Sequence, residues 1–268
     1  MTTPYGNHIV VPDPQAKPGE PLNYMEWIGK YIEEKNPTAV INIGDHADMD
    51  SLSSFDRGKL QFEGRRFSAD VAASNMANDL LLGPIFETGA HEHIETHITV
   101  GNHENRIARF AQDNPELAGF VDISQLEYDY YYDNVHDFLV PVTIDGVTYC
   151  HYFYNPMTGR PWGGMIETRI KNVGFSFTMG HQQGLQYGMR TLANGRMQHG
   201  MIAGSSYLHY EDYKGPQAND HWRGIVQKYA VKDGTYDAKF IAIGSLCQRY
   251  EGISLEKFMR SPDLHIGV

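Results

Sequence analysis

The sequence predicts a single α/β domain, because short apolar strands alternate with helical segments through its first half. Several of these strands end in a cluster of polar residues. The second half reads as mostly strands joined by long loops, and no linker divides the chain. We therefore predict one domain over residues 1–268, with its functional loops at the strand ends.

Eight apolar segments are expected to form strands, and five of them run directly into polar side chains. These five are residues 8–11 before Asp13, 39–43 before Asp45, 97–100 before Asn102, 147–150 before His151, and 175–179 before His181. The other three cover residues 200–203, 224–231 and 238–243. Loops at strand ends are where such sheets bind their ligands, so the polar clusters are the candidate site.

Two helices are expected between the first three strands. Residues 22–35 have apolar side chains at helical spacing and end before Asn36, and residues 68–82 are rich in alanine and leucine with Ser68 as the cap. Residues 207–222 are expected to form a surface loop, and 128–132 an aromatic strand or loop edge.

Composition excludes several classes of protein. The formal net charge of -11 lowers the expectation of tight, nonspecific DNA binding, which usually needs a basic face. Two cysteines provide no disulfide framework, and we predict a buried Cys150. We find neither a signal peptide nor an apolar run of membrane-spanning length, so no membrane partner is expected. A cytoplasmic location follows, which is the host cytoplasm if a phage encodes the chain.

The polar residues at the strand ends are all types that bind metals, and two clusters have a specific spelling. Residues 44–48 fit GDxxD, through Asp45 and Asp48, and residues 101–104 read GNHE, through Asn102 and His103. A GNHE tetrapeptide arises by chance about once in a thousand chains of this length. From Asp13 to about residue 183 the chain resembles the calcineurin-like metallophosphoesterases, and the loop 49–66 resembles that of members carried by bacteriophages.

The resemblance implies a four-layer αββα sandwich, with two mixed sheets face to face and helices outside. It also implies two divalent cations, and the residues that hold each one. Asp45 would bridge them, Asn102, His151 and His181 would complete the second site, and Asp13, Gln15 and Gln183 the first. His103 would act as the general acid that protonates the leaving oxygen, and Asp48 would orient its ring.

The first site departs from the family, which usually has histidine where this chain has Gln15 and Gln183. Because an amide oxygen is neutral and harder than an imidazole nitrogen, we expect that site to favour Mn²⁺ or Mg²⁺ over Zn²⁺. The second site keeps two histidines and is expected to hold Mn²⁺, Fe²⁺ or Zn²⁺ more firmly. Of these cations we favour Mn²⁺.

The expected reaction is attack of a metal-bound hydroxide on a phosphomonoester or phosphodiester, with a nucleotide or small phosphate ester as the substrate. Arg65, Arg66 and Arg106 are candidates for binding its phosphate. A DNA or RNA nuclease of the same superfamily, and a weakly active or non-catalytic metal-binding module, remain as alternatives. His91, His93 and His97 are interpreted as surface histidines. The oligomeric state cannot be predicted from these residues.

Overall fold

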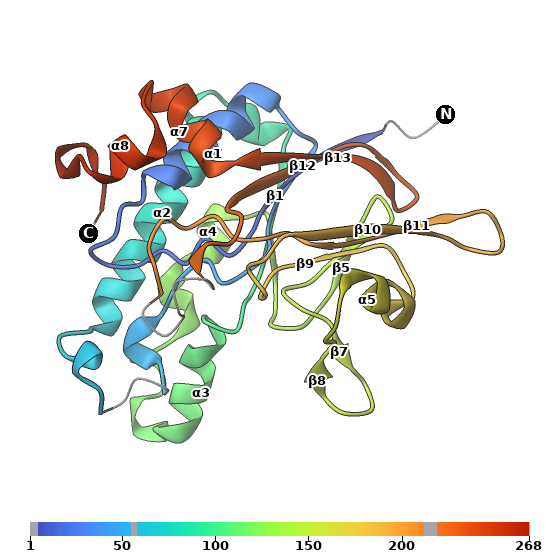
Figure 1. Ribbon diagram of the computed structural model, residues 1–268. Coiled ribbons are helices and arrows are strands. Elements are labelled where there is room, and N and C mark those ends of the chain that lie inside the picture. The colour runs from blue at the N-terminus through green and yellow to red at the C-terminus, as the bar shows by residue number, and fades with distance from the viewer. Residues whose placement is uncertain (1–4, 55–57, 212–218, 268) are drawn as a thin grey trace.

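The structure, a computed structural model, describes residues 5–54, 58–211 and 219–267 (Figure 1). It is an α/β arrangement built on two mixed β-sheets. The larger sheet has the order β13-β12-β1-β2-β3-β4, and the smaller one β10-β11-β9-β6-β5. The α/β prediction is therefore confirmed.

Parallel strands form the centre of the larger sheet. β1 (Gly6–Val11), β2 (Ala39–Asn42), β3 (Glu95–Thr99) and β4 (Asn134–His136) run parallel to one another in this order. The antiparallel hairpin of β12 (Gly224–Lys232) and β13 (Thr235–Ala242) joins the sheet beside β1. The carboxyl ends of β1, β2 and β3 therefore share one edge.

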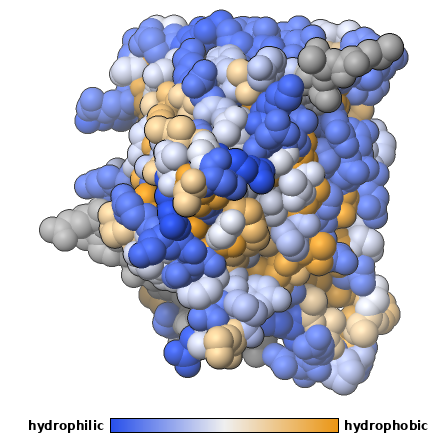
Figure 2. Space-filling model, turned by 90° about the vertical axis from the view of Figure 1, so that its right-hand side faces the viewer, coloured by the Kyte–Doolittle hydropathy of each residue, from blue (hydrophilic) through white to orange (hydrophobic). Residues whose placement is uncertain are grey.

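The smaller sheet repeats this arrangement. β6 (Val147–Tyr149), β9 (Phe177–Met179) and β11 (Met197–Ile202) run parallel, while β5 (Val142–Ile144) and β10 (Gln186–Thr191) are antiparallel edge strands. A separate two-stranded ribbon pairs β7 (Tyr154–Asn155) with β8 (Arg160–Pro161). Figure 2 views the molecule from the end that carries the β10–β11 hairpin, where apolar residues show among polar ones.

The two sheets pack against each other through one apolar cluster. Val10 and Ile41 of the larger sheet share it with Tyr149 and Met201 of the smaller one. α1 (Asn23–Lys35) and α2 (Phe67–Glu87) pack together against the opposite face of the larger sheet, next to α7 (Ile243–Glu251) and α8 (Leu255–Met259). α5 (Ile166–Val173) lies against β10 and β11. The remaining helices are α3 (Asn105–Asp113) and α4 (Tyr128–Tyr131).

Several local predictions were wrong. α2 begins after Arg66 and continues through Pro84 to Glu87, and its N-cap makes no side-chain hydrogen bond, so Ser68 is not the cap. The second half contains helices α5, α7 and α8 as well as strands. Residues 128–131 form helix α4, because the rings of Tyr128 and Tyr131 are buried against the core instead of lining a strand edge.

Two segments are more buried than expected. Residues 207–211 belong to the predicted surface loop, yet Tyr207, His209 and Glu211 are at most 4% exposed; residues 212–218 lie outside the described part of the chain. His97 is buried, with its Nδ1 3.2 Å from Nε2 of His136, whereas His93 is exposed as predicted. Cys150 is a buried free cysteine, as expected. Within the described residues, we find no helix of the length and apolarity needed to cross a membrane.

Candidate metal centre

The polar strand ends of both sheets converge on one place. Asp13, Asp45 and Asn102 follow the parallel strands β1, β2 and β3, while His151 and His181 follow the parallel strands β6 and β9. The loops after β1 and β2 are joined side by side, because Ala16 and Ala47 form a parallel bridge. The two facing sheets therefore bring residues from the whole length of the chain to a single site.

Asn102 holds the two histidines of the predicted second site together. Its Oδ1 lies 2.9 Å from Nε2 of His151 and 2.6 Å from Nδ1 of His181. Oδ1 of Asp45 lies 3.3 Å from Nε2 of His151. Ligand atoms of Asp45, His151 and His181 all lie within 4.8 Å of one another, which is close enough to share a cation.

The contact between His151 and Asp45 sets the protonation of both side chains. Nδ1 of His151 donates to the carbonyl of Ile43 at 2.9 Å, so Nε2 is the nitrogen that faces Asp45. Burial lowers the pKa of His151, but the charge and hydrogen bond of Asp45 outweigh it and raise the pKa to about 9. For Asp45, burial raises the pKa, but the charges of His103 and His151 outweigh it and leave the pKa below its usual range.

The predicted first site contains polar atoms that no protein group satisfies. Asp13 and Gln15 are fully buried, and among the described residues Oδ2 of Asp13 and both amide atoms of Gln15 have no hydrogen-bond partner. Burial, helped by the charge of Asp45, outweighs the opposing charge of His151 and raises the pKa of Asp13 to about 7. Buried polar groups normally have partners, so the two oxygens, Oδ2 of Asp13 and Oε1 of Gln15, fit a bound cation, whereas the amide nitrogen of Gln15 can only donate a hydrogen bond.

Gln183, the other amide predicted for this site, has a protein partner. Its Oε1 accepts a hydrogen bond from the hydroxyl of Tyr207 at 3.0 Å, and its side chain is 8% exposed. A carbonyl oxygen has two lone pairs, so this contact leaves room for a second interaction. Gln183 therefore lies at the site with its oxygen already oriented by Tyr207.

Backbone strain is concentrated in the same residues. Of the twelve described non-glycine residues with positive φ, five are predicted ligands. They are Asp13 (36°), Gln15 (47°), Asp45 (49°), His181 (68°) and Gln183 (58°). Such conformations cost about 1–3 kcal/mol each and persist only where the surroundings enforce them, which is typical of functional sites.

Glu104, to which the sequence analysis gave no role, joins the two motifs. Its fully buried carboxylate accepts hydrogen bonds from the backbone N–H groups of Gly101 (2.9 Å), Asp45 (3.2 Å) and Ala47 (3.0 Å), and from the hydroxyl of Tyr128 (3.2 Å). The last residue of GNHE thus fixes the backbone of GDxxD. The close approach also requires glycine, since a Cβ on Gly101 would lie 2.1 Å from the nitrogen of Asp45.

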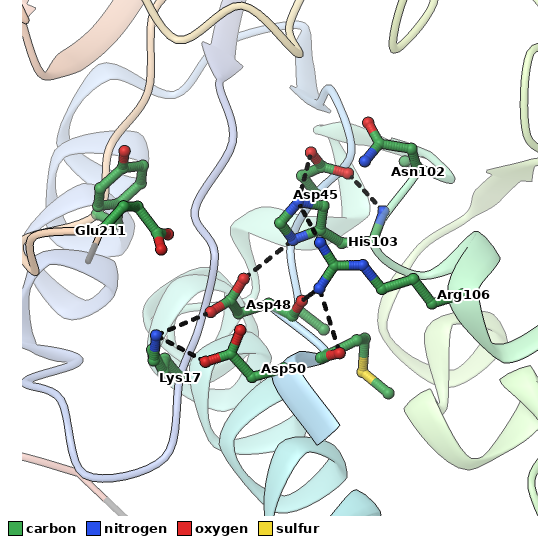
Figure 3. A network of polar contacts seen from close by, with 12 residues as sticks. Lys17, Asp45, Asp48, Asp50, Asn102, His103, Arg106 and Glu211 are labelled. Carbon is green, nitrogen blue, oxygen red and sulfur yellow. Dashed lines mark hydrogen bonds and ion pairs between the residues drawn. The ribbon is translucent and has the colours of Figure 1, made fainter. Parts of the chain in front are cut away.

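His103 and Asp48 form a close pair, which Figure 3 shows at the centre of a polar network. Nδ1 of His103 lies 3.0 Å from Oδ1 of Asp48, and its Nε2 lies 3.7 Å from Oδ2 of Asp45. Burial lowers the pKa of His103, but Asp45 and Asp48 outweigh burial and the opposing charge of Arg106, so the pKa lies above its usual value. The imidazole can therefore carry a proton while held against Asp48.

Lys17 lies behind this pair. Its Nζ is 3.4 Å from Oδ2 of Asp48 and 2.7 Å from Oδ2 of Asp50, and Figure 3 shows it on the side of Asp48 away from His103. Arg65 adds a second cation 3.4 Å from the same oxygen of Asp50. For Asp48, burial raises the pKa, but His103 and Lys17 outweigh it and leave the pKa below its usual range. For Asp50, burial and the charge of Asp48 outweigh Lys17 and Arg65, so the pKa stays above its usual value.

A cavity of about 380 Å³ opens onto the site. Its lining includes ligand and catalytic candidates: Asp45, Asp48, Asn102, His103, His181 and Gln183. Asp50, Ser53, Lys59, Arg106 and Glu211 also line it. Its size suits a small molecule, because ligand pockets typically enclose roughly 300–1,000 Å³.

The three arginines predicted to bind phosphate have different positions. Arg106 lines the cavity, but its Nη1 donates to the carbonyls of Asp48 (2.8 Å) and Met49 (3.3 Å), and its Nη2 lies 3.0 Å from Nε2 of His103. Arg65 and Arg66 line a neighbouring cavity of about 440 Å³ instead. Arg65 donates from Nη1 to the carbonyl of Asp50 at 3.2 Å, so the phosphate-binding role of Arg65 and Arg66 stays a prediction.

Sequence reasoning missed two residues that line the cavity. Asp50 stands in the loop after GDxxD, and Glu211 in the segment predicted to be a surface loop. Lys59, which also lines the cavity, was considered for phosphate binding from its place after GDxxD. Only the glutamate of GNHE could have been noticed, since its motif was already identified. The chain was also compared with protein-family models and with curated proteins, and neither comparison gives a match.

Proposed function

We propose that this protein is a metal-dependent phosphoesterase of the calcineurin-like type, with a four-layer αββα fold. One observation supports this more than any other. Asp45, Asn102, His151 and His181 come from four strand ends and gather within contact distance beside the His103–Asp48 pair, and all of them except His151 line a single cavity. A scaffold or packing role requires neither the convergence nor the buried, unpartnered atoms of Gln15.

The residues of the chain divide into holding and proton-transfer roles. Asp45, Asn102, His151 and His181 would hold one cation, and Asp13, Gln15, Gln183 and Asp45 the other. When bound, such a pair supplies an acidified water for attack and neutralises the phosphoryl oxygens. Nδ1–H of His151 fixes its tautomer on Ile43, which leaves Nε2 for coordination.

His103 is the proposed general acid. Asp48 holds its Nδ1, which leaves Nε2 as the nitrogen that would donate a proton to the departing alkoxide. Nη2 of Arg106 lies 3.0 Å from Nε2, so this donation requires that contact to be released. General acid catalysis of this kind contributes about 10²–10⁴ in rate. Arg106 is a positioning residue in this proposal, because it ties the carbonyls of Asp48 and Met49 to the helix that follows GNHE.

The two cation sites are proposed to differ in preference. The histidine pair suits Mn²⁺, Fe²⁺ or Zn²⁺, whereas Asp13, Gln15 and Gln183 present only oxygen and amide groups, which favour Mn²⁺ or Mg²⁺. Mn²⁺ suits both sets and is the preferred ion of this proposal.

A small phosphate ester is the favoured substrate class over a duplex nucleic acid. The cavity of about 380 Å³ accepts one small molecule, and the chain has a net charge of -11. A nuclease would need cationic groups along a groove, yet Arg106 is committed to backbone carbonyls and Arg65 to Asp50. The nuclease remains the second candidate, to be tested on the same protein.

Metal titration against a chromogenic substrate tests the proposal. The purified protein is stripped with a chelator, reloaded with Mn²⁺, and assayed on bis(4-nitrophenyl) phosphate, 4-nitrophenyl phosphate, and single- and double-stranded DNA. We expect Mn²⁺-dependent turnover of at least one nitrophenyl ester, with a loss of about a hundredfold or more in Asp45→Ala and His103→Ala. Turnover that is absent, or is unchanged in Asp45→Ala, would refute the proposal.

A further inference from the structure

Glu211 forms part of the cavity wall that faces the catalytic pair. It is only 4% exposed, and it nevertheless lines the cavity. Figure 3 shows its carboxylate turned toward the space beside Asp48 and His103. A carboxylate oxygen of Glu211 lies within 4.8 Å of a carboxylate oxygen of Asp48. Oδ1 of Asp48 in turn lies 3.0 Å from Nδ1 of His103. A group bound next to the acid is therefore within reach of Glu211.

The position of Glu211 is fixed by specific contacts. The side chain of Asn219 pairs with both its backbone groups, accepting from its N–H at 2.9 Å and donating to its carbonyl at 3.0 Å. Nε2 of His209 lies 3.2 Å from its Oε1, and the imidazole of His209 stacks on the ring of Tyr207. A carboxylate held at its backbone and at one oxygen is preorganised for a ligand.

The chemistry of this wall selects the kind of ligand. Burial raises the pKa of Glu211, but the hydrogen bond and charge of His209, together with the charge of Lys17, outweigh it and leave the pKa below its usual range. An ionised carboxylate accepts hydrogen bonds and donates none, so it binds hydroxyl groups and repels anions. The neighbouring Asp50 has a pKa raised by burial and by Asp48, and its Oδ2 contacts both Lys17 and Arg65, which leaves Glu211 as the stronger acceptor.

We propose that Glu211 forms a subsite for the leaving group of the ester, and that this group is an uncharged alcohol bearing further hydroxyls, such as a sugar or another polyol. The inference rests on the proposed function, because His103 protonates the oxygen of that same group. The subsite would not accept a second phosphate, because the phosphate oxygens and the carboxylate of Glu211 are both negatively charged and would repel each other.

Two esters that differ only in their hydroxyl groups provide the test. Glycerol 1-phosphate and propyl phosphate, each also as its methyl diester, have leaving groups of the same carbon chain. With the Mn²⁺-loaded wild-type protein we expect kcat/KM to be about tenfold or more higher for the glycerol ester, because a buried acceptor left without its donor is costly. Equal values for the two esters in the wild type would overturn the inference without the need for any variant.

The variant Glu211→Gln then assigns the preference to this carboxylate. Its readout is the ratio of kcat/KM between the two esters, in which a general loss of activity cancels. We expect the ratio to fall to within about twofold of unity, and Glu211→Asp to restore part of it. Glu63→Gln is the matched control, because Glu63 is exposed and lines only the neighbouring cavity. A ratio that Glu211→Gln leaves at its wild-type value would overturn the assignment.

These outcomes remain distinct from a failure of the proposed function. If the Mn²⁺-loaded wild type hydrolyses neither nitrophenyl ester, both proposals are wrong. If it hydrolyses a nitrophenyl ester but prefers propyl to glycerol phosphate, the phosphoesterase stands and the leaving-group subsite is refuted.

Discussion

Gln15→Leu should stabilise the metal-free protein. The amide of Gln15 is fully buried, and neither its oxygen nor its nitrogen has a hydrogen-bond partner among the described residues. Each unsatisfied buried group costs about 1–3 kcal/mol, whereas leucine fills a similar volume without polar atoms. We therefore expect a gain of about 2 kcal/mol in the free energy of unfolding, which raises Tm by roughly 4 °C or more in a chain of this size.

Adding Mn²⁺ should reduce or reverse this difference. A ligand present at a hundred times its Kd stabilises the folded state by about 2.7 kcal/mol, and the wild type has one more ligand than the variant to offer. The assay is thermal denaturation of both proteins in chelator and in rising Mn²⁺. Gln186→Leu is the control, because Oε1 of Gln186 also lacks a partner but belongs to β10.

The reasoning fails if Gln15→Leu is less stable than the wild type in chelator. That result would mean that the amide has a structural partner and is not held ready for a cation. An equal response of both proteins to Mn²⁺ would remove Gln15 from the ligand set, even if the variant were more stable. Gln186→Leu should show the same Mn²⁺ response as the wild type.

Three further predictions concern buried charges. Glu104→Gln should lower the free energy of unfolding by about 2–4 kcal/mol and weaken Mn²⁺ binding, because the amide places an NH2 donor opposite a backbone N–H donor. Urea denaturation measures the first effect, and calorimetric titration with Mn²⁺ measures the second. Burial lowers the pKa of His8 from 6.5 to about 4, so the folded state binds fewer protons than the unfolded state between these pH values. The free energy of unfolding should therefore fall by ~3 kcal/mol as the pH drops from 6.5 to 4. In His8→Gln, the midpoint of urea denaturation should depend less on pH over this range. Burial lowers the pKa of Lys228 below 10.5, so the free energy of unfolding should rise as the pH becomes alkaline. Lys228→Met should remove this pH dependence and raise the free energy of unfolding at pH 7 by ~1 kcal/mol or more. A pH dependence that persists in Lys228→Met would contradict the prediction.

The central strands could be predicted from the sequence because each is a short apolar run with its own boundary signal. β1, β2, β3 and β12 lie within a few residues of their predicted limits. Strands β4 and β5 were missed, since each has only three residues and a half-buried pattern without clear alternation. α5 and α7 were missed as well, because strands and loops dominated the reading of the second half.

The candidate ligands were found for the same local reason. A strand followed at once by a polar cluster can be recognised without knowing the fold, and Asp13, Asp45, Asn102, His151 and His181 all have that form. Glu211 lacks this pattern, because no strand comes directly before it and its neighbours in the sequence are mostly polar. Glu211 is held by the two hydrogen bonds between its backbone and the side chain of Asn219, next to the buried Tyr207, and these contacts exist only in the folded chain.

In the proposed metal centre, protons and cations would be alternative occupants. Four carboxylates, those of Asp13, Asp45, Asp48 and Glu104, are at most 1% exposed, and buried charges of one sign require compensation. Without cations this would come from a proton on Asp13, whose pKa is about 7, and one on His151, whose pKa is about 9. Cations bound by these residues would displace both protons, because a ligand must be deprotonated. The excess of buried carboxylates, together with the unpartnered amide of Gln15, is therefore the physical basis for expecting two cations here.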